Sequence, residues 1–159
     1  MGRGILDVTQ IRDEPAEMRD GTLLRADTYT PSGGGRHPVL VSRTPYDKSD
    51  PGNEETARGL AARGYVVVVQ DIRGRYRSEG EFAWQFQDNS ETFDAQDGYD
   101  TAEWAATLPG SDGQVGTWGH SYPAWCSWRM ASARPPSLKA LFAGGISKQL
   151  LDLTYGIFE

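Results

Sequence analysis

The sequence predicts an α/β fold in which a mostly parallel sheet is covered by helices. Four consecutive valines, residues 66–69, show no polar alternation, as is typical of a strand buried on both faces of such a sheet. From Val39 onward, short apolar segments alternate with segments rich in helix formers, which indicates repeated strand–helix units. The 159 residues match one ordinary domain with a core of its own.

The elements begin with two strands, at residues 8–12 and 23–29, separated by a tight turn at Asp20-Gly21-Thr22. We expect these strands to form an antiparallel start to the sheet. A short apolar strand at residues 39–43 follows, and Pro45 ends it because proline cannot donate a hydrogen bond to a ladder.

The next segment predicts a helix over residues 53–63. Glu54 and Glu55 lie in its first turn and Arg63 in its last, which suits the helix dipole, and Gly64 is expected to cap its carboxyl end.

The second half continues the alternation. A helix is expected over residues 94–108, with Phe93, Trp104 and Leu108 contributing apolar surface and Pro109-Gly110 ending it. The remaining predicted elements are a strand at 114–118, a helix at 122–132 and a strand at 138–143.

Composition and charge exclude several classes of protein. A net charge of −6 argues against a nucleic-acid partner, because no basic surface is available to replace phosphate counterions. The amino-terminal residues lack an apolar signal core, and no apolar run approaches membrane-spanning length. We therefore expect a cytoplasmic protein without a membrane partner. Cys126 is the single cysteine, so no internal disulfide can form, and a buried, unreactive side chain is expected.

The segment most informative about chemistry is residues 116–125, Gly-Thr-Trp-Gly-His-Ser-Tyr-Pro-Ala-Trp. A strand, then Gly-x-Ser, then a helix is the pattern of a nucleophile elbow, in which a sharp turn exposes the serine at the sheet edge. Gly119 leaves room beside Ser121, and the following helix directs N–H groups at developing negative charge. Pro123 stands where the generic Gly-x-Ser-x-Gly pattern has its second glycine, so this pattern alone leaves an ordinary turn as the alternative.

Several further segments resemble the cocaine esterase and X-Pro dipeptidyl-peptidase family of acyl hydrolases, which has the α/β-hydrolase fold. The family's usual elbow, Gly-x-Ser-Tyr-x-Gly, is kept at Ser121-Tyr122, whereas Ala124 replaces its closing glycine and Tyr76 stands where the family commonly has glycine. The similar segments, in the expected order, are residues 18–24, 44–48, 64–65, 70–74, 78–82, 97–101 and 116–122.

The resemblance implies roles for three residues of this sequence. Ser121 would be the nucleophile, and the Tyr46 hydroxyl and the Tyr122 backbone N–H would form the oxyanion hole. Neither a cofactor nor a metal ion is expected. The charged side chains Asp71, Arg73 and Asp97 are interpreted as pairs that fix loops.

The acid and base of a serine triad have no candidate in the sequence. The two histidines are interpreted as structural: His120 adjoins Ser121 and points away from it, and His37 lies in a loop before an early strand. The fold orders its triad as serine, acid, histidine, so both partners are expected after residue 159.

The resemblance accordingly assigns residues 1–146 to the amino-terminal part of the catalytic domain, truncated after the strand that follows the nucleophile helix. Residues 147–159 are assigned to the start of a helical cap. A chain of this extent is expected to be inactive alone and to associate through its unpaired sheet edge.

The leading interpretation is therefore a serine hydrolase that cleaves a small-molecule ester or amide through an acyl-serine intermediate, with carboxylic esters first. Release of X-Pro dipeptides and β-lactam acyl transfer are alternatives within that class, and a non-catalytic hydrolase-like module is an alternative outside it. A dinucleotide-binding domain is set aside because no Gly-x-Gly-x-x-Gly follows a strand. The oligomeric state stays open.

Overall fold

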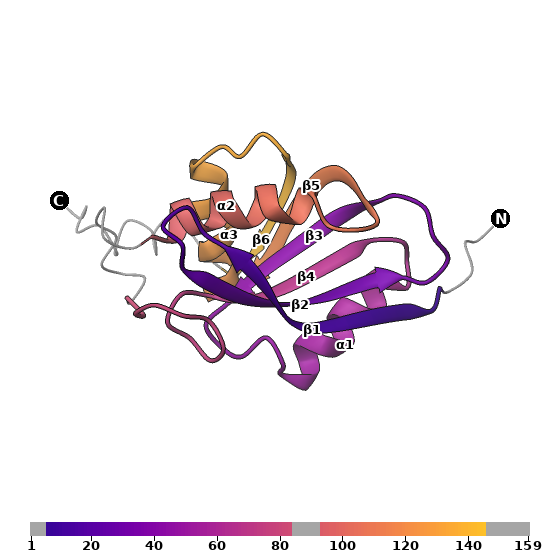
Figure 1. Ribbon diagram of the computed structural model, residues 1–159, viewed down its shortest axis with the longest axis horizontal. Helices are drawn as coiled ribbons and strands as arrows, with labels where there is room; N and C mark the ends of the chain where they lie inside the picture. Colours follow the sequence, from indigo (N-terminus) through magenta and orange to yellow (C-terminus); the bar gives the residue numbers. More distant parts are fainter. Residues whose placement is uncertain (1–5, 84–92, 146–159) are drawn as a thin grey trace.

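In the computed structural model, which describes residues 6–83 and 93–145, six strands form one sheet in the order β1-β2-β4-β3-β5-β6 (Figure 1). β1 and β2 are antiparallel to each other, β2 is antiparallel to β4, and β4, β3, β5 and β6 are mutually parallel. The prediction of an α/β fold with a mostly parallel sheet is confirmed. The elements are β1 Val8–Glu17, β2 Leu23–Pro31, β3 His37–Thr44, α1 Pro51–Ala61, β4 Val66–Asp71, α2 Asp94–Ala106, β5 Ser111–His120, α3 Tyr122–Ser132 and β6 Leu138–Gly144.

The valines of β4 divide between two cores, one on each face of the sheet. Val67 and Val69 belong to the cluster that contains residues of α1, while Val66 and Val68 belong to the cluster that contains residues of α2 and α3. Figure 1 shows the same arrangement, with α1 on one side of the sheet and α2 and α3 on the other. A strand covered on both faces has no polar side to present, which explains the uninterrupted apolar run.

Several element boundaries differ from the predicted ones. α1 begins two residues earlier, because the Asp50 carboxylate caps it by accepting a hydrogen bond from the Gly52 N–H at 2.9 Å, and Pro51 occupies its first turn. β1 continues to Glu17 through an irregularity between Ile11 and Glu14.

The later boundaries shift as well. α2 ends at Ala106, and β5 covers Ser111–His120, five residues longer than predicted. Phe93 was wrongly expected to contribute apolar surface. Its side chain is exposed, and the Arg73 guanidinium lies 4.5 Å from the centre of its ring.

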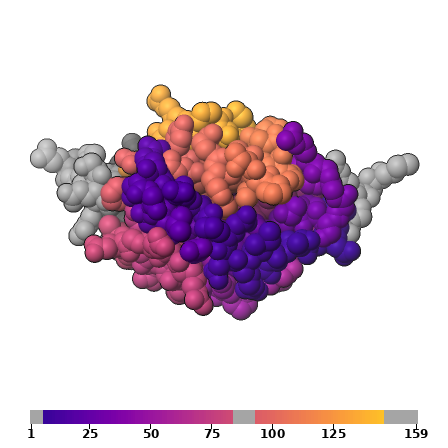
Figure 2. All heavy atoms as spheres, in the orientation of Figure 1, coloured from indigo at the N-terminus to yellow at the C-terminus, as the bar shows by residue number. Residues whose placement is uncertain are grey.

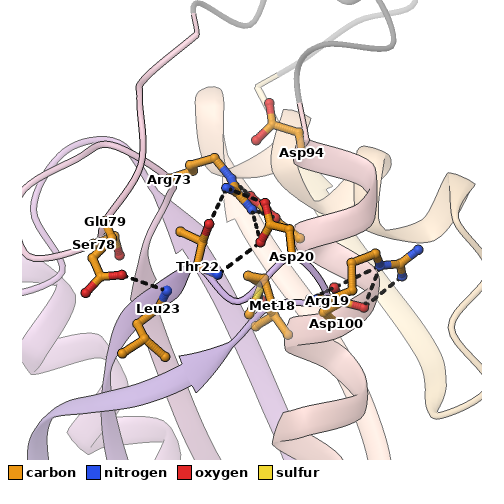
Figure 3. Close-up of polar contacts among 12 residues, drawn as sticks. Met18, Arg19, Asp20, Thr22, Leu23, Arg73, Ser78, Glu79, Asp94 and Asp100 are labelled. Atoms are coloured by element: carbon orange, nitrogen blue, oxygen red, sulfur yellow. Dashed lines mark hydrogen bonds and ion pairs between the residues drawn. The ribbon is translucent and has the colours of Figure 1, made fainter.

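A network of charged side chains fastens the β1–β2 turn to α2 (Figure 3). The Arg73 guanidinium donates to Asp97 at 2.7 and 2.9 Å and to Asp20 at 2.8 Å, and Arg19 pairs with Asp100 at 2.7 Å. The hydrogen bond from Arg73 is the main cause that lowers the pKa of Asp20 to about 2. The interpretation of Arg73 and Asp97 as a loop-fixing pair is confirmed.

β6 forms one edge of the described sheet, and the atoms nearest the carboxyl end of the described chain, yellow in Figure 2, lie along one rim of the molecule in this view. The residues of β6 are only partly covered, and the Phe142 side chain is 68% exposed. Because β3, β5 and β6 are parallel, their carboxyl ends lie together on one side of the sheet, which we call the carboxyl edge. That edge holds the candidate active site.

Candidate active site

Ser121 lies at a sharp turn between the end of β5 and the start of α3. Its backbone adopts φ 59° and ψ −123°, a positive-φ conformation that a residue with a Cβ rarely adopts and that costs about 1–3 kcal/mol. The surrounding hydrogen bonds hold it there. The Ser121 N–H donates to the Gly144 carbonyl of β6 at 2.9 Å, and its own carbonyl accepts from the Ala124 and Trp125 N–H groups at 2.9 and 3.1 Å. The side chain is exposed to solvent at the carboxyl edge of the sheet.

The turn is possible because α3 approaches β5 closely at Gly119. A Cβ on that residue would lie 2.3 Å from the carbonyl carbon of Pro123 and 2.6 Å from the nitrogen of Ala124. Both neighbours are backbone atoms, so no rotamer change can make room for a side chain. Ala124 itself is fully buried, so the small side chain that replaces the family's closing glycine fits within the elbow.

Tyr46 lies in the segment that follows β3, on the same edge of the sheet as Ser121. Its N–H donates to the Thr44 hydroxyl at 3.0 Å, and its side chain is 54% exposed. Tyr46 and Ser121 line one open cavity of about 520 Å³. The structure therefore brings together two of the three residues to which the resemblance assigns roles.

Tyr122, the third of them, is the first residue of α3. Its backbone N–H belongs to the first turn of the helix, where amides point toward the amino end of the helix and the dipole favours negative charge. Its ring is buried and meets the ring of Tyr46 edge to face, with the two ring centroids 6.1 Å apart. The two tyrosines are thus in direct contact beside Ser121.

The two histidines differ in their distance from Ser121: His37 is far from it, whereas His120 directly precedes it and lines the same cavity. His37 pairs with Ser111, the first residue of β5, so the length of that strand, roughly 30 Å, separates it from Ser121. Its Nδ1 lies 3.1 Å from the Gly64 carbonyl oxygen. It is the first residue of β3, which corrects its assignment to a loop. The ring of His120 lies against the carboxyl end of β6, where its atoms would be 2.4–2.8 Å from a Cβ at Gly145.

The cavity has a polar wall that the sequence analysis did not identify. Asp50, Asn53 and Thr56, from the first half of α1 and its cap, line the same cavity as Ser121. Trp118 and Phe142 add apolar surface from β5 and β6. The Asp-Pro dipeptide that starts α1 was the available signal, since it places the helix start directly after the Tyr46 segment.

Cys126, in α3, is buried, and burial raises the pKa of its thiol. This confirms its interpretation as a small apolar side chain. Among residues 6–83 and 93–145, no cluster of histidine, cysteine or acidic side chains has the geometry to hold a metal ion. The described helices include none with the length and hydropathy needed to cross a bilayer.

The strand order and the turn at Ser121 define this chain as part of an α/β-hydrolase fold. Solved structures with the same arrangement include an α-amino acid ester hydrolase, with a TM-score of 0.72 and 29% identity over 86% of this chain and 25% of that one. Another is an aminopeptidase from the marine sediment archaeon Thaumarchaeota archaeon, with a TM-score of 0.73 and 28% identity over 86% of this chain and 25% of that one.

Residues 20–153 match the model of the X-Pro dipeptidyl-peptidase (S15) family. The chain is also 38% identical over 128 residues to the cocaine esterase of Rhodococcus sp. (strain MB1 Bresler). The chain belongs to the X-Pro dipeptidyl-peptidase (S15) family, a family of esterase- and peptidase-type hydrolases. The match covers 78% of this chain and 21% of the esterase, so the chain spans about a fifth of the length of that relative.

Proposed function

We propose that this chain supplies the nucleophile and the oxyanion hole of a serine hydrolase that cleaves carboxylic esters. The Ser121 hydroxyl oxygen adds to the substrate carbonyl, and a base accepts its proton. The Tyr46 hydroxyl and the Tyr122 N–H donate hydrogen bonds to the resulting oxyanion. Collapse of this intermediate releases the alcohol, which takes the proton from the protonated base, and leaves an acyl-serine that water hydrolyses in a second, equivalent addition.

One observation carries the proposal: a serine in a strained turn and a tyrosine from another strand line the same cavity. Backbone strain of this kind persists where the surrounding structure enforces it, and it is concentrated at functional sites. An oxyanion hole needs fixed donors, each of which lowers the barrier by about 3–4 kcal/mol. The first turn of α3 and the Tyr46 side chain are suited to provide them.

We further propose that the triad acid and histidine come from residues outside this 159-residue sequence. A serine hydroxyl needs a base within hydrogen-bond reach. His37 lies at the opposite edge of the sheet, and His120 precedes Ser121 directly and lies against Gly145. The isolated chain should therefore bind but not turn over an ester.

Esters are the first choice of substrate because the curated relative is an esterase. Amides are the second choice, since the family is described by its X-Pro dipeptidyl-peptidase activity. Both substrates use the same addition to a carbonyl, and they differ in the leaving group, which an amide nitrogen makes harder to expel.

The test uses the protein at its full natural length and a fluorophosphonate probe that phosphonylates an activated serine. We expect labelling of the peptide that contains Ser121, loss of labelling and of p-nitrophenyl ester hydrolysis in Ser121→Ala, and faster turnover of the ester than of an X-Pro p-nitroanilide. Ser127→Ala is the matched control, because Ser127 lies in the same helix with its hydroxyl 2.9 Å from the Thr117 hydroxyl in the core.

Three outcomes would contradict parts of the proposal. Hydrolysis that survives Ser121→Ala would remove the serine mechanism. Absence of both labelling and hydrolysis in the folded complete protein would favour a non-catalytic module. Ester turnover by the purified 159-residue chain, abolished by Ser121→Ala, would show that the base lies within this sequence.

A further inference from the structure

We infer that Lys48 is a positioning residue for the oxyanion hole: its buried ammonium fixes the segment that carries Tyr46 to the antiparallel edge of the sheet. The inference rests on the proposed role of Tyr46, and it adds a determinant that lies outside the residues lining the cavity. Lys48 does not touch the substrate in this scheme. It acts through the backbone of residues 46–48.

The Lys48 side chain lies in a cage of three carboxylates, although a lysine is seldom fully buried. It is 1% exposed, and its Nζ lies 2.6 Å from Asp13 Oδ1, 3.2 Å from Asp27 Oδ1 and 3.7 Å from Asp71 Oδ2. The Lys48 N–H also donates to Asp71 Oδ1 at 2.8 Å. Its backbone and its side chain are therefore both attached to the body of the sheet.

The cage joins elements that are distant in sequence. Asp13 belongs to β1, Asp27 to β2 and Asp71 to the end of β4, whereas Lys48 follows β3. Removing the ammonium would leave the buried Asp27 and Asp71 carboxylates with less compensating charge, since Arg12, 3.8 Å from Asp27, would remain, and this is costly in a site with little access to water. Loss of this interaction would therefore destabilise the fold, and the segment after β3 stays fixed to β1, β2 and β4.

The backbone on both sides of this contact is strained. Asp13 has φ 54° and lies within the irregularity between Ile11 and Glu14. Its N–H donates to Asp27 Oδ1 at 3.0 Å. Asp47, directly between Tyr46 and Lys48, has φ 78°. Asp13 and Asp47 thus both have left-handed backbone conformations, although each carries a Cβ. Asp13 places its carboxylate beside the Lys48 ammonium, and Asp47 forms the turn that joins Tyr46 to Lys48.

Tyr46 is consequently held from two sides. On one side its ring meets the ring of Tyr122, with the centroids 6.1 Å apart. On the other side the chain is fixed two residues later at Lys48. The Tyr46 ring is half exposed and has little buried surface of its own to fix it, so its aim depends on these two supports. Of these two supports, the contact at Lys48 can be removed by a substitution that neutralises its charge.

The experiment compares Lys48→Met and Asp13→Asn with a matched control, Glu14→Gln. Asparagine tolerates the left-handed conformation of residue 13, and the Asp13 side chain is 48% exposed, so this variant keeps the test open if Lys48→Met fails to fold. Glu14 borders the same irregularity and loses the same charge, but its carboxylate accepts a hydrogen bond from the Thr28 hydroxyl at 2.8 Å. In the 159-residue chain, amide hydrogen exchange and the Tyr46 ring resonances are measured.

In the two test variants we expect amides 46–49 to exchange roughly tenfold to a hundredfold faster, with β4 unchanged. The Tyr46 ring resonances should move toward those of a solvated tyrosine, which a general loss of stability in a still folded chain does not produce. Glu14→Gln should leave both signals as they are. In the complete protein, Asp13→Asn should lower kcat with little change in KM.

Unchanged exchange and unchanged Tyr46 resonances in folded Asp13→Asn or Lys48→Met would overturn the inference, whatever the protein catalyses. The inference would also be overturned if residues 46–49 exchange faster in Asp13→Asn while its kcat stays at the wild-type value, and Tyr46→Phe does lower kcat. A wild-type kcat in Tyr46→Phe would instead refute the proposed role of Tyr46, so the two failures are distinguished by that variant.

Discussion

Replacing Gly119 with alanine tests the geometry of the elbow directly. The added Cβ would lie 2.3 Å from the carbonyl carbon and 2.4 Å from the carbonyl oxygen of Pro123. The start of α3 must withdraw by about 1 Å to restore ordinary contact. Because the obstacle is backbone, we expect the upper end of the usual overpacking cost, about 3 kcal/mol.

The assay is urea unfolding followed by tryptophan fluorescence, with Gly116→Ala as the control. A loss of about 3 kcal/mol should lower the urea midpoint by about 1–3 M. Gly116 lies in the same strand, but a Cβ there would meet mainly the movable end of the Leu40 side chain, at 3.1 Å, so its midpoint should fall far less. Equal midpoints for wild type, Gly119→Ala and Gly116→Ala would refute the close approach of α3 to β5.

The remaining predictions concern the site, the core and the charged network. Tyr46→Phe in the complete protein should lower kcat by about 100- to 1000-fold and leave KM nearly unchanged in steady-state ester hydrolysis; an unchanged kcat would exclude its hydroxyl as an oxyanion donor. Cys126 should resist a thiol reagent in the folded chain and react after unfolding, because burial raises the pKa of its thiol; rapid labelling without denaturant would contradict the packed core. Asp20 has its pKa lowered to about 2 by Arg73, so its contribution to stability is complete above its unfolded pKa of about 4 and is lost as the pH falls toward 2. Urea midpoints of wild type and Asp20→Asn should therefore differ at pH 6 and converge near pH 2, and a constant difference would refute the pairing.

The local features of the fold could be predicted because their causes lie within a few residues. The valine run predicts a strand covered on both faces, and the glycine and serine spacing predicts the elbow, since each pattern states a local steric or solvation requirement. In the structure, Ser121 lies at a sharp turn between β5 and α3. α1 begins two residues before its predicted start because Asp50 caps it and Pro51 occupies its first turn, which the pattern of helix-forming residues does not indicate.

The cage around Lys48 could not be predicted because its causes are distant in sequence. A lysine next to an aspartate suggests a solvated loop, and only the pairing of β1, β2 and β4 brings the three carboxylates together. The left-handed backbone at residue 13 could not be predicted either, because the residue there is aspartate and not glycine. Strand order and the position of His37 likewise follow from tertiary structure, which no local pattern specifies.

The hydrogen bond between the Ser121 amide and the Gly144 carbonyl ties the bend to the last residue of a rim strand. Within the described part of the chain, β6 has one lateral neighbour, and strands supported on one side open more readily than central ones. Mild heating that frays this strand would therefore disturb the direction of the hydroxyl while the valine-rich centre stays folded. The direction of the Ser121 hydroxyl would then be lost before the secondary structure, and a molecule bound along β6 would protect the bend more than it protects the fold.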